Sequence, residues 1–202
     1  MSFYSRFVLP PILNWVMKDK RLRARREQLV PRAHGAVLEV GIGSGLNLPF
    51  YDRGRVRSLS AVDPSAELLA MARKKAKALG MEVELEQQSA ARLPFPAGRF
   101  DCVLVTWTLC SIPDPAAALA EMRRVLKSGG ELLFVEHGLA PDPGVARWQR
   151  RLTPLWRPLA GGCHLDRPIE ALVRGAFASA EVETFYLKGP RFITFMYEGR
   201  AR

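Results

Sequence analysis

Cysteine and histidine are scarce in this chain, with three of each among 202 residues. The cysteine positions fit neither a disulfide framework nor a zinc-ligand spacing, and no cluster of His and carboxylate residues has the spacing of metal ligands. We therefore expect a cytoplasmic protein of a reducing compartment, with no metal site. Long apolar runs are missing as well: the stretch 7–17 is short and contains two prolines, so we expect no bilayer span. The N-terminal basic residues follow the apolar part, which is the reverse of a secretory signal.

Acidic residues are outnumbered, 20 against 30 Lys and Arg, which gives a formal net charge of +10. Residues 1–34 hold eight basic and two acidic residues, and residues 147–174 hold six basic and two acidic residues. The rest of the chain is balanced, with sixteen basic and sixteen acidic residues. A basic chain is a candidate for nucleic-acid binding, but the sequence has no aromatic-flanked catalytic motif and no appended RNA-binding module. Because the charge belongs to two flanking segments, an anionic membrane surface is the other candidate partner.

The segment around which the chain is organised is 36–46, Ala-Val-Leu-Glu-Val-Gly-Ile-Gly-Ser-Gly-Leu. Its apolar part predicts a buried parallel strand, and Gly41, Gly43 and Gly45 follow at the carboxyl end of that strand. Glycines remove every Cβ where the chain must turn and a ligand must approach the main chain. Open α/β sheets bind ligands at this edge, so the segment predicts a ligand site.

Two cofactors suit a glycine-rich turn after a first strand. The dinucleotide fingerprint G-x-G-x-x-G/A needs a small sixth residue, and this chain has Leu46 there. Glu39, two residues before the first glycine, offers nothing to a pyrophosphate. It can attract the α-ammonium group of S-adenosylmethionine, directly or through water. The pattern therefore favours S-adenosylmethionine and disfavours a nicotinamide oxidoreductase.

Beyond the glycine turn, strand and helix patterns alternate, which predicts parallel βαβ units with right-handed crossovers. The fold class is thus α/β, a single doubly wound sheet over residues 35–202. Residues 1–34 predict an N-terminal helical cap with a basic rim, broken near Pro10 and Pro11; it is a solvated cover, a lid over the cofactor or a membrane contact. The expected strands are 56–62, 81–88, 100–106 and 131–136, the expected helices 65–79, 115–126 and 168–177, and the expected closing hairpin 180–188 with 192–199.

Four motifs in order and register resemble the class I S-adenosylmethionine-dependent methyltransferases, specifically methyltransferase type 11. They are Glu39–Gly45, Ala61–Ser65, Leu93–Asp101 and Arg124–Gly130. The resemblance covers roughly residues 35–137 and implies a Rossmann-like seven-stranded sheet whose last strand is antiparallel. Within the family, three further segments are similar to the methyltransferase-like 7 group of small-molecule and thiol methyltransferases: Cys110-Ser111, Glu136-His137 and Gly161–Arg167.

The resemblance also implies which residues hold the cofactor. Asp63, eighteen residues past Gly45 at a strand end, is expected to accept hydrogen bonds from both ribose hydroxyls. The loop of Ser89 and Ala90 is where the family recognises adenine, with Ser89 in place of the usual aspartate. The full set of expected cofactor-binding residues is Glu39, Gly41, Gly43, Gly45, Asn47, Asp63, Pro64, Ser89, Ala90, Thr106, Trp107 and Leu109.

Methyl transfer from a sulfonium is an in-line displacement, so alignment of the reactants and exclusion of water are the main tasks of the protein. A thiol reacts as its thiolate and an amine in its neutral form, so a base is useful. His137 is the first candidate base, and His164 with Asp166 the second. A structural hydrogen-bonding role competes for both histidines.

The predicted function is methyl transfer from S-adenosylmethionine to a small or lipophilic acceptor: a thiol, an amine or a phospholipid headgroup. Two alternatives stay open: a nucleic-acid methyltransferase, and a protein that binds the cofactor at a membrane surface without turnover. Peripheral membrane association of the cytoplasmic protein would fit the apolar and basic N-terminal segment. Residues 1–30 and 138–170 carry no motif that names the acceptor.

Overall fold

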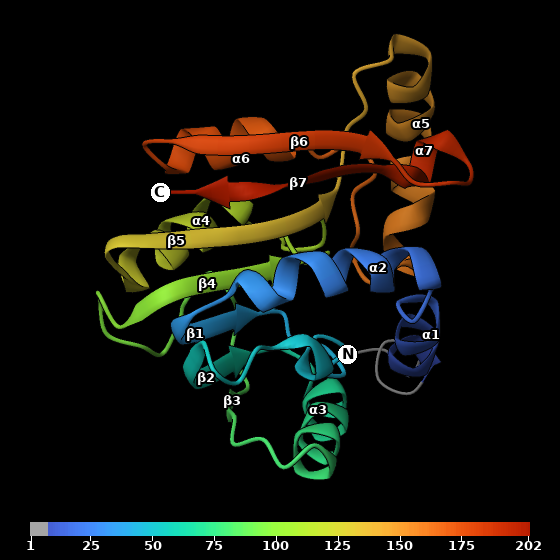
Figure 1. The fold of residues 1–202 in the computed structure, drawn as a ribbon. Coiled ribbons are helices and arrows are strands. Elements are labelled where there is room, and N and C mark those ends of the chain that lie inside the picture. Colours follow the sequence, from blue (N-terminus) through green and yellow to red (C-terminus); the bar gives the residue numbers. More distant parts are fainter. Residues whose placement is uncertain (1–7) are drawn as a thin grey trace.

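The computed structural model describes residues 8–202, and its centre is one seven-stranded sheet in the order β3-β2-β1-β4-β5-β7-β6 (Figure 1). β1 to β5 are parallel, and β7 runs antiparallel to both β5 and β6. The predicted α/β sheet with an antiparallel last strand is confirmed. The first seven residues of the predicted cap lie outside the described residues. The strands are β1 (Gly35–Val40), β2 (Val56–Val62), β3 (Glu84–Glu86), β4 (Phe100–Thr106), β5 (Leu126–His137), β6 (Ala180–Tyr186) and β7 (Phe195–Ala201).

Helices cover both faces of the sheet. On one face Leu29 of α2 and Ala72 of α3 pack against the sheet, and on the other face Leu119 of α4 and Val173 of α6 do so. Because helices cover both faces of β1, every residue of this strand after Gly35 is buried. Such a strand is apolar along most of its length. The α-helices are α1 (Leu9–Val16), α2 (Lys20–Leu29), α3 (Ala66–Ala78), α4 (Pro115–Val125), α5 (Pro143–Leu159), α6 (Ile169–Ala176) and α7 (Arg191–Thr194).

Several predicted boundaries are set by local side-chain chemistry. The hydroxyl of Ser65 accepts a hydrogen bond from the main-chain N–H of Leu68 and caps α3, and the Asp114 carboxylate caps α4. The strand expected over 81–88 is only three residues long, because it pairs with the end of β2 alone at the edge of the sheet. In the closing hairpin β7 begins at Phe195 rather than at 192, since α7 occupies the turn.

The predicted break near Pro10 and Pro11 stays a prediction, because the chain before Val8 lies outside the described residues. Pro10 and Pro11 lie in the first turn of α1, where a proline has no intrahelical hydrogen bond to lose. Within the described residues, a break falls between Val16 and Lys20. There the Asp19 side chain accepts from Arg21 N–H at 2.8 Å and starts α2 as a separate helix.

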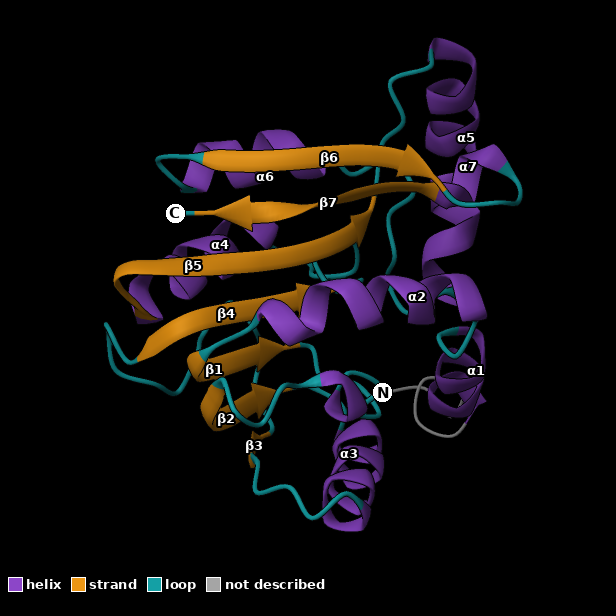
Figure 2. Cartoon of the chain, in the orientation of Figure 1, coloured by secondary structure: helices purple, strands orange, loops and turns teal. Residues whose placement is uncertain are grey.

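Helix α5 was not predicted. Pro154 and Pro158 lie inside it, and prolines within a segment normally argue against a helix there. Figure 2 shows α5 and α1 at the end of the sheet to which the arrowheads of β1, β4 and β5 point. Both helices therefore stand at the edge where an open α/β sheet binds its ligands.

Candidate active site

A cavity of about 350 Å³ lies at the carboxyl ends of β1, β2 and β4, with α1 forming part of its wall. It is the place predicted by the glycine turn. Three residues predicted for the cofactor, Glu39, Gly45 and Leu109, lie behind the wall rather than in it. The predicted cofactor residues that do line the cavity are Gly41, Gly43, Asn47, Asp63, Pro64, Ser89, Ala90, Thr106 and Trp107.

The three glycines of the turn all have positive φ but differ in what surrounds them. A Cβ on Gly41 would lie 2.2 Å from Thr108 Oγ1, and one on Gly45 would lie 2.8 Å from Leu48 Cδ1, so both glycines allow close packing of the protein on itself. A Cβ on Gly43, at φ +54°, would meet nothing within 4 Å. Gly43 is therefore the glycine whose bare backbone faces open space in the cavity wall.

Asp63 joins the glycine turn to the end of β2. Its carboxylate accepts hydrogen bonds from the main-chain N–H groups of Gly43 and Ser65, each at 2.9 Å. Burial raises the pKa of Asp63, and these two hydrogen bonds oppose that rise. Each oxygen keeps a free lone pair in the cavity wall, as the predicted ribose contact requires.

Glu39 reaches the cavity only through a second residue. Its carboxylate is 1% exposed and accepts from Asn47 Nδ2 at 2.8 Å and from Tyr51 Oη at 2.7 Å. Asn47 Nδ2 also lies 3.0 Å from Thr106 Oγ1. These contacts fix the orientation of the Asn47 amide, whose Oδ1 is buried without a partner among residues 8–202. The carboxylate thus holds a cavity-lining amide with its acceptor oxygen unused.

Arg26 of α2 is a cavity residue that the sequence did not reveal. It is 3% exposed, its Nη1 donates to Met17 O at 2.9 Å, and its Cζ lies 4.6 Å from the centre of the Trp107 ring. Its Nε is buried without a partner in the described part of the chain. Desolvation lowers the Arg26 pKa to about 10, although the charge of Glu39 raises it. In the sequence Arg26 is one of a run of arginines, and nothing in that run sets it apart.

Trp107 has an unusual backbone conformation for a non-glycine residue, with φ at 49°. Its main-chain N–H donates to Val135 O at 2.8 Å, which continues the pairing of β4 with β5 by one residue. The left-handed conformation turns the chain sharply after β4. The indole then lies in the cavity wall between the strand end and Arg26. The strained conformation is therefore found at the wall of the predicted ligand site.

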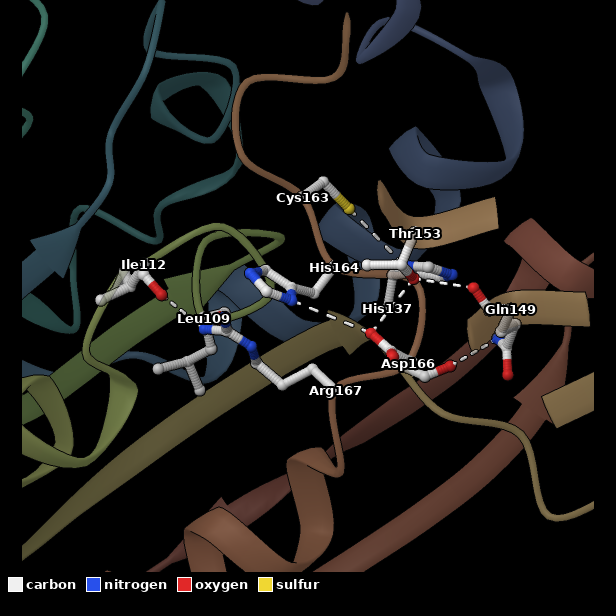
Figure 3. Close-up of polar contacts among 10 residues, drawn as sticks. Leu109, Ile112, His137, Gln149, Thr153, Cys163, His164, Asp166 and Arg167 are labelled. Atoms are coloured by element: carbon white, nitrogen blue, oxygen red, sulfur yellow. Dashed lines mark hydrogen bonds and ion pairs between the residues drawn. The ribbon is translucent and has the colours of Figure 1, made fainter. Parts of the chain in front are cut away.

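The loop after β4 is held from two sides by buried charges. Glu136, which is fully buried, accepts from the N–H groups of Thr108 and Leu109 and more weakly from that of Cys110. Burial raises the Glu136 pKa to about 7 against the effect of these bonds. Arg167 Nη1 donates to the carbonyl oxygens of Leu109 and Ile112 (Figure 3). Glu136 and Arg167 therefore fix the main chain of Leu109 behind the cavity wall.

The two predicted bases lie outside the residues that line the cavity. His137 Nδ1 is 3.7 Å from Cys163 Sγ, and His164 Nδ1 is 3.8 Å from Asp166 Oδ1 (Figure 3). Thr153 Oγ1 of α5 also lies 3.1 Å from that Asp166 oxygen. The predicted pairing of His164 with Asp166 is present, but as part of a structural network behind the wall. Their role as bases stays a prediction.

The cavity contains complementary polar groups for an amino-acid moiety. Asn47 Oδ1 is an unused acceptor suited to an ammonium group, and Arg26 is a buried cation suited to a carboxylate. The face of Trp107 is favourable for a positive centre such as a sulfonium. Together with Asp63, these groups fit S-adenosylmethionine, which carries an ammonium, a carboxylate, a sulfonium and a ribose.

Comparisons with known proteins agree with this chemistry. The methyltransferase domain family matches residues 38–134. A phosphatidylethanolamine N-methyltransferase of Cereibacter sphaeroides is 39% identical over 151 residues, which is 73% of this chain and 72% of that protein. A thiol S-methyltransferase of Rattus norvegicus is 32% identical over 152 residues, which is 73% of this chain but only 62% of that protein.

Solved structures show the same fold. A Thermotoga maritima S-adenosylmethionine-dependent methyltransferase matches with a TM-score of 0.67 at 23% identity, covering 98% of both chains. The N-methyltransferase NodS of Bradyrhizobium japonicum, solved with S-adenosylhomocysteine, matches with a TM-score of 0.68 at 18% identity over 93% of this chain and 90% of that one. With the sheet order, the glycine turn and these relatives together, the chain belongs to the class I S-adenosylmethionine-dependent methyltransferases.

Proposed function

We propose that this methyltransferase acts on the amine of a phospholipid headgroup presented at a lipid surface. The observation that carries the proposal is a group of exposed apolar side chains beside the cavity, on α1 and α5. We call this group the apolar rim. Its members, with their exposed fractions, are Ile12 (44%), Trp15 (76%), Val16 (46%), Trp148 (57%), Leu155 (70%) and Leu159 (64%).

The apolar rim lies on the two helices that reach the cavity, although none of its own members lines the cavity. Leu9 and Leu13 of α1 line the cavity, as does Gly161 just after α5. A Cβ on Gly161 would lie 3.3 Å from Leu13 Cδ1, so the end of α5 packs against α1. Single exposed apolar residues are ordinary, but a group of them beside a ligand cavity indicates an interaction surface.

The charge of the same region favours an anionic lipid surface. α5 carries four exposed arginines among its apolar residues, and Lys18 and Lys20 flank the turn between α1 and α2. Apolar side chains with neighbouring cations are the pattern of helices that lie in a membrane interface. Within residues 8–202 no helix is long and apolar enough to cross a membrane. The relative of Cereibacter sphaeroides is named for phosphatidylethanolamine, a lipid with such a headgroup amine.

The cavity residues suggest how the reactants are held. We infer that Asp63 binds the ribose, Ser89 and Ala90 border the adenine, Asn47 binds the ammonium and Arg26 binds the carboxylate of the cofactor. The bound cofactor supplies an activated methyl group on sulfur. Trp107 and the apolar residues of α1 exclude water from this end of the cavity, which strengthens electrostatic interactions there. A low-dielectric wall also favours the neutral, nucleophilic form of an amine over its ammonium form.

The acceptor is tested by measuring S-adenosylhomocysteine release with three substrates: phosphatidylethanolamine in anionic vesicles, soluble phosphoethanolamine and a soluble thiol. We expect release with the vesicles at a rate at least about tenfold above the other two, since the interface concentrates enzyme and headgroup together. Release with the thiol alone would overturn the lipid assignment and favour a thiol acceptor, for which the rat relative is named.

A paired substitution tests the apolar rim. Trp15→Glu with Leu155→Glu should reduce vesicle binding and lipid methylation about tenfold or more, because two charges would be placed at the apolar surface. Ala70→Glu, on the exposed side of α3, is the matched control and should leave both unchanged. Binding of S-adenosylhomocysteine should be the same in all three proteins. Full lipid methylation by the double variant would show that the rim is not the docking surface.

A further inference from the structure

Two cysteines meet beside the cavity, and neither of them lines it. Cys110 lies in the loop after β4, and Cys163 lies in the segment between α5 and α6. The N–H of His164 donates to the carbonyl oxygen of Cys110 at 2.8 Å, so the two backbones are adjacent. The two thiols are close enough for each to shift the pKa of the other. Both cysteines are free in the structure.

The third member of this group is His137, at the end of β5. Its Nδ1 lies 3.7 Å from Cys163 Sγ, while its Nε2 is buried without a partner among the described residues (Figure 3). The three side chains come from three separate segments of the chain. We call them the thiol cluster: Cys110, His137 and Cys163. None of its members lines the cavity that we assign to the cofactor.

The surroundings make the two thiols unequal. The Cys110 thiol and the proximity of His137 lower the pKa of Cys163, against the effect of its burial. The Cys163 thiol and complete burial raise the pKa of Cys110, as does the nearby Glu136. Glu136, Arg167 and His164 are the other titratable groups whose charges act on Cys163. Cys163 is thus the more acidic thiol of the pair, and Cys110 is the one that holds its proton more firmly.

Cys163 is also the accessible member of the pair. It is half-buried, whereas Cys110 is only 3% exposed and Cys102 is completely buried. The two residues before it, Gly161 and Gly162, border open surface grooves. A nucleophilic thiolate near the surface with a second thiol in contact is the arrangement in which disulfide exchange is rapid.

We propose that Cys163 and Cys110 form a modification site for low-molecular-weight disulfides, at which the pair becomes an intramolecular disulfide. The Cys163 thiolate attacks one sulfur of the small disulfide, forms a mixed disulfide and releases a small thiolate. Cys110 passes its proton to that thiolate, and its sulfur displaces the second small thiolate from Cys163. Two protein sulfurs are oxidised, and the small disulfide is reduced to one thiol and one thiolate.

The bond would join two parts of the cavity wall. Ser111 and Ile112 follow Cys110 and line the cavity, and Ala160 and Gly161 precede Cys163 and line it too. A disulfide needs Cα atoms within about 4.4–6.8 Å, which the adjacent backbones permit without moving either segment far. Oxidation would therefore fix the wall beside the apolar rim while leaving the glycine turn untouched.

The test is incubation of the folded protein with oxidised glutathione, followed by intact mass measurement and peptide mapping. We expect loss of two hydrogens and a Cys110–Cys163 linked peptide, reversed by dithiothreitol. Cys110→Ser should stop at a glutathione adduct on Cys163, and Cys163→Ser should give neither product. Cys102→Ser is the matched control, since that buried thiol of β4 lies outside the thiol cluster; it should behave as the parent protein.

A second measurement does not depend on whether the Cys110 variant folds. In the parent protein at pH 6, iodoacetamide should alkylate Cys163 roughly tenfold faster than an ordinary exposed cysteine, which is mostly protonated there. His137→Gln should slow this reaction. Equal slow labelling of all three cysteines, or a fully reduced protein after glutathione treatment, would overturn the proposal. Neither readout uses methyl transfer, so the result is separate from the identity of the acceptor.

Discussion

The two halves of the cavity wall are built in different ways. The half at β1 and β2 consists of main chain and short buried side chains: Gly43, Asp63 and the Asn47 amide held by Glu39. The half at α1, α2 and the end of α5 consists of long side chains, chiefly Arg26, Leu13 and Met17. The first half is fixed by the sheet itself. The second is carried by helical segments outside the sheet, and it supplies Arg26 for the cofactor as well as the apolar residues next to the proposed acceptor surface.

The largest effect is expected from a substitution in the half of the cavity wall at β1 and β2. Gly43→Val should weaken S-adenosylhomocysteine binding by more than about a hundredfold, because its side chain would enter open space in the cavity wall. The change also forces a branched residue to adopt φ +54°, at a cost of about 1–2 kcal/mol in folding.

The matched control for this substitution is Gly129→Val, near the start of β5. Gly129 has φ +77° and likewise no atom within 4 Å of its Cβ position, so it carries the backbone cost alone. Isothermal calorimetry would measure binding of both variants. Normal binding by Gly43→Val would show that the cofactor does not lie against the turn.

The next effect also concerns the first half. Asp63→Ala should weaken the binding of S-adenosylhomocysteine by about 1.5–3 kcal/mol, the usual loss when a charged hydrogen-bonding partner is removed. Because Asp63 also holds Gly43 N–H, part of this loss would come from a looser turn. The ligand 5′-methylthioadenosine, which keeps the ribose but lacks the amino-acid part, should lose affinity equally. A loss confined to S-adenosylhomocysteine would contradict a ribose contact.

Arg26→Gln tests the half of the cavity wall formed by α1, α2 and the end of α5. It should weaken S-adenosylhomocysteine about tenfold by removing the cation for the carboxylate, and it should leave 5′-methylthioadenosine unchanged. Arg23→Gln, on the exposed side of the same helix, is the control for loss of charge. If Arg26→Gln weakens both ligands alike, Arg26 supports the fold of the cavity and does not bind the carboxylate.

The last expected effect, on stability rather than on binding, is a pH dependence. Burial raises the Glu39 pKa from 4.5 to about 7, so the folded state binds this proton more tightly than the unfolded state does. Stability supplied by the protonated form is therefore complete below about pH 4.5 and is lost as the pH rises towards 7, with a slope of at most about 1.4 kcal/mol per pH unit. Glu39→Gln should flatten this slope in urea unfolding measured from pH 5 to 7. An unchanged slope would mean that Glu39 is ionised throughout.

The sequence was a good guide where one residue type is needed for a local physical reason. Positive φ at Gly41 and Gly43, the Ser65 cap of α3 and the carboxylate at the end of β2 all follow from short-range rules. Arg26 could not be predicted, because its burial depends on how α2 lies across the sheet and not on its neighbours in sequence. Likewise α5 contains internal prolines that local rules count against a helix.

Glu136 has a consequence for how an anionic ligand can be oriented. Three successive amide hydrogens after β4 form a ready cradle for a negative group, and the protein fills it with its own side chain. A carboxylate arriving with the cofactor finds those amides already occupied. In the arrangement that we propose, this carboxylate meets the Arg26 guanidinium instead, which would make α2 part of the finished site.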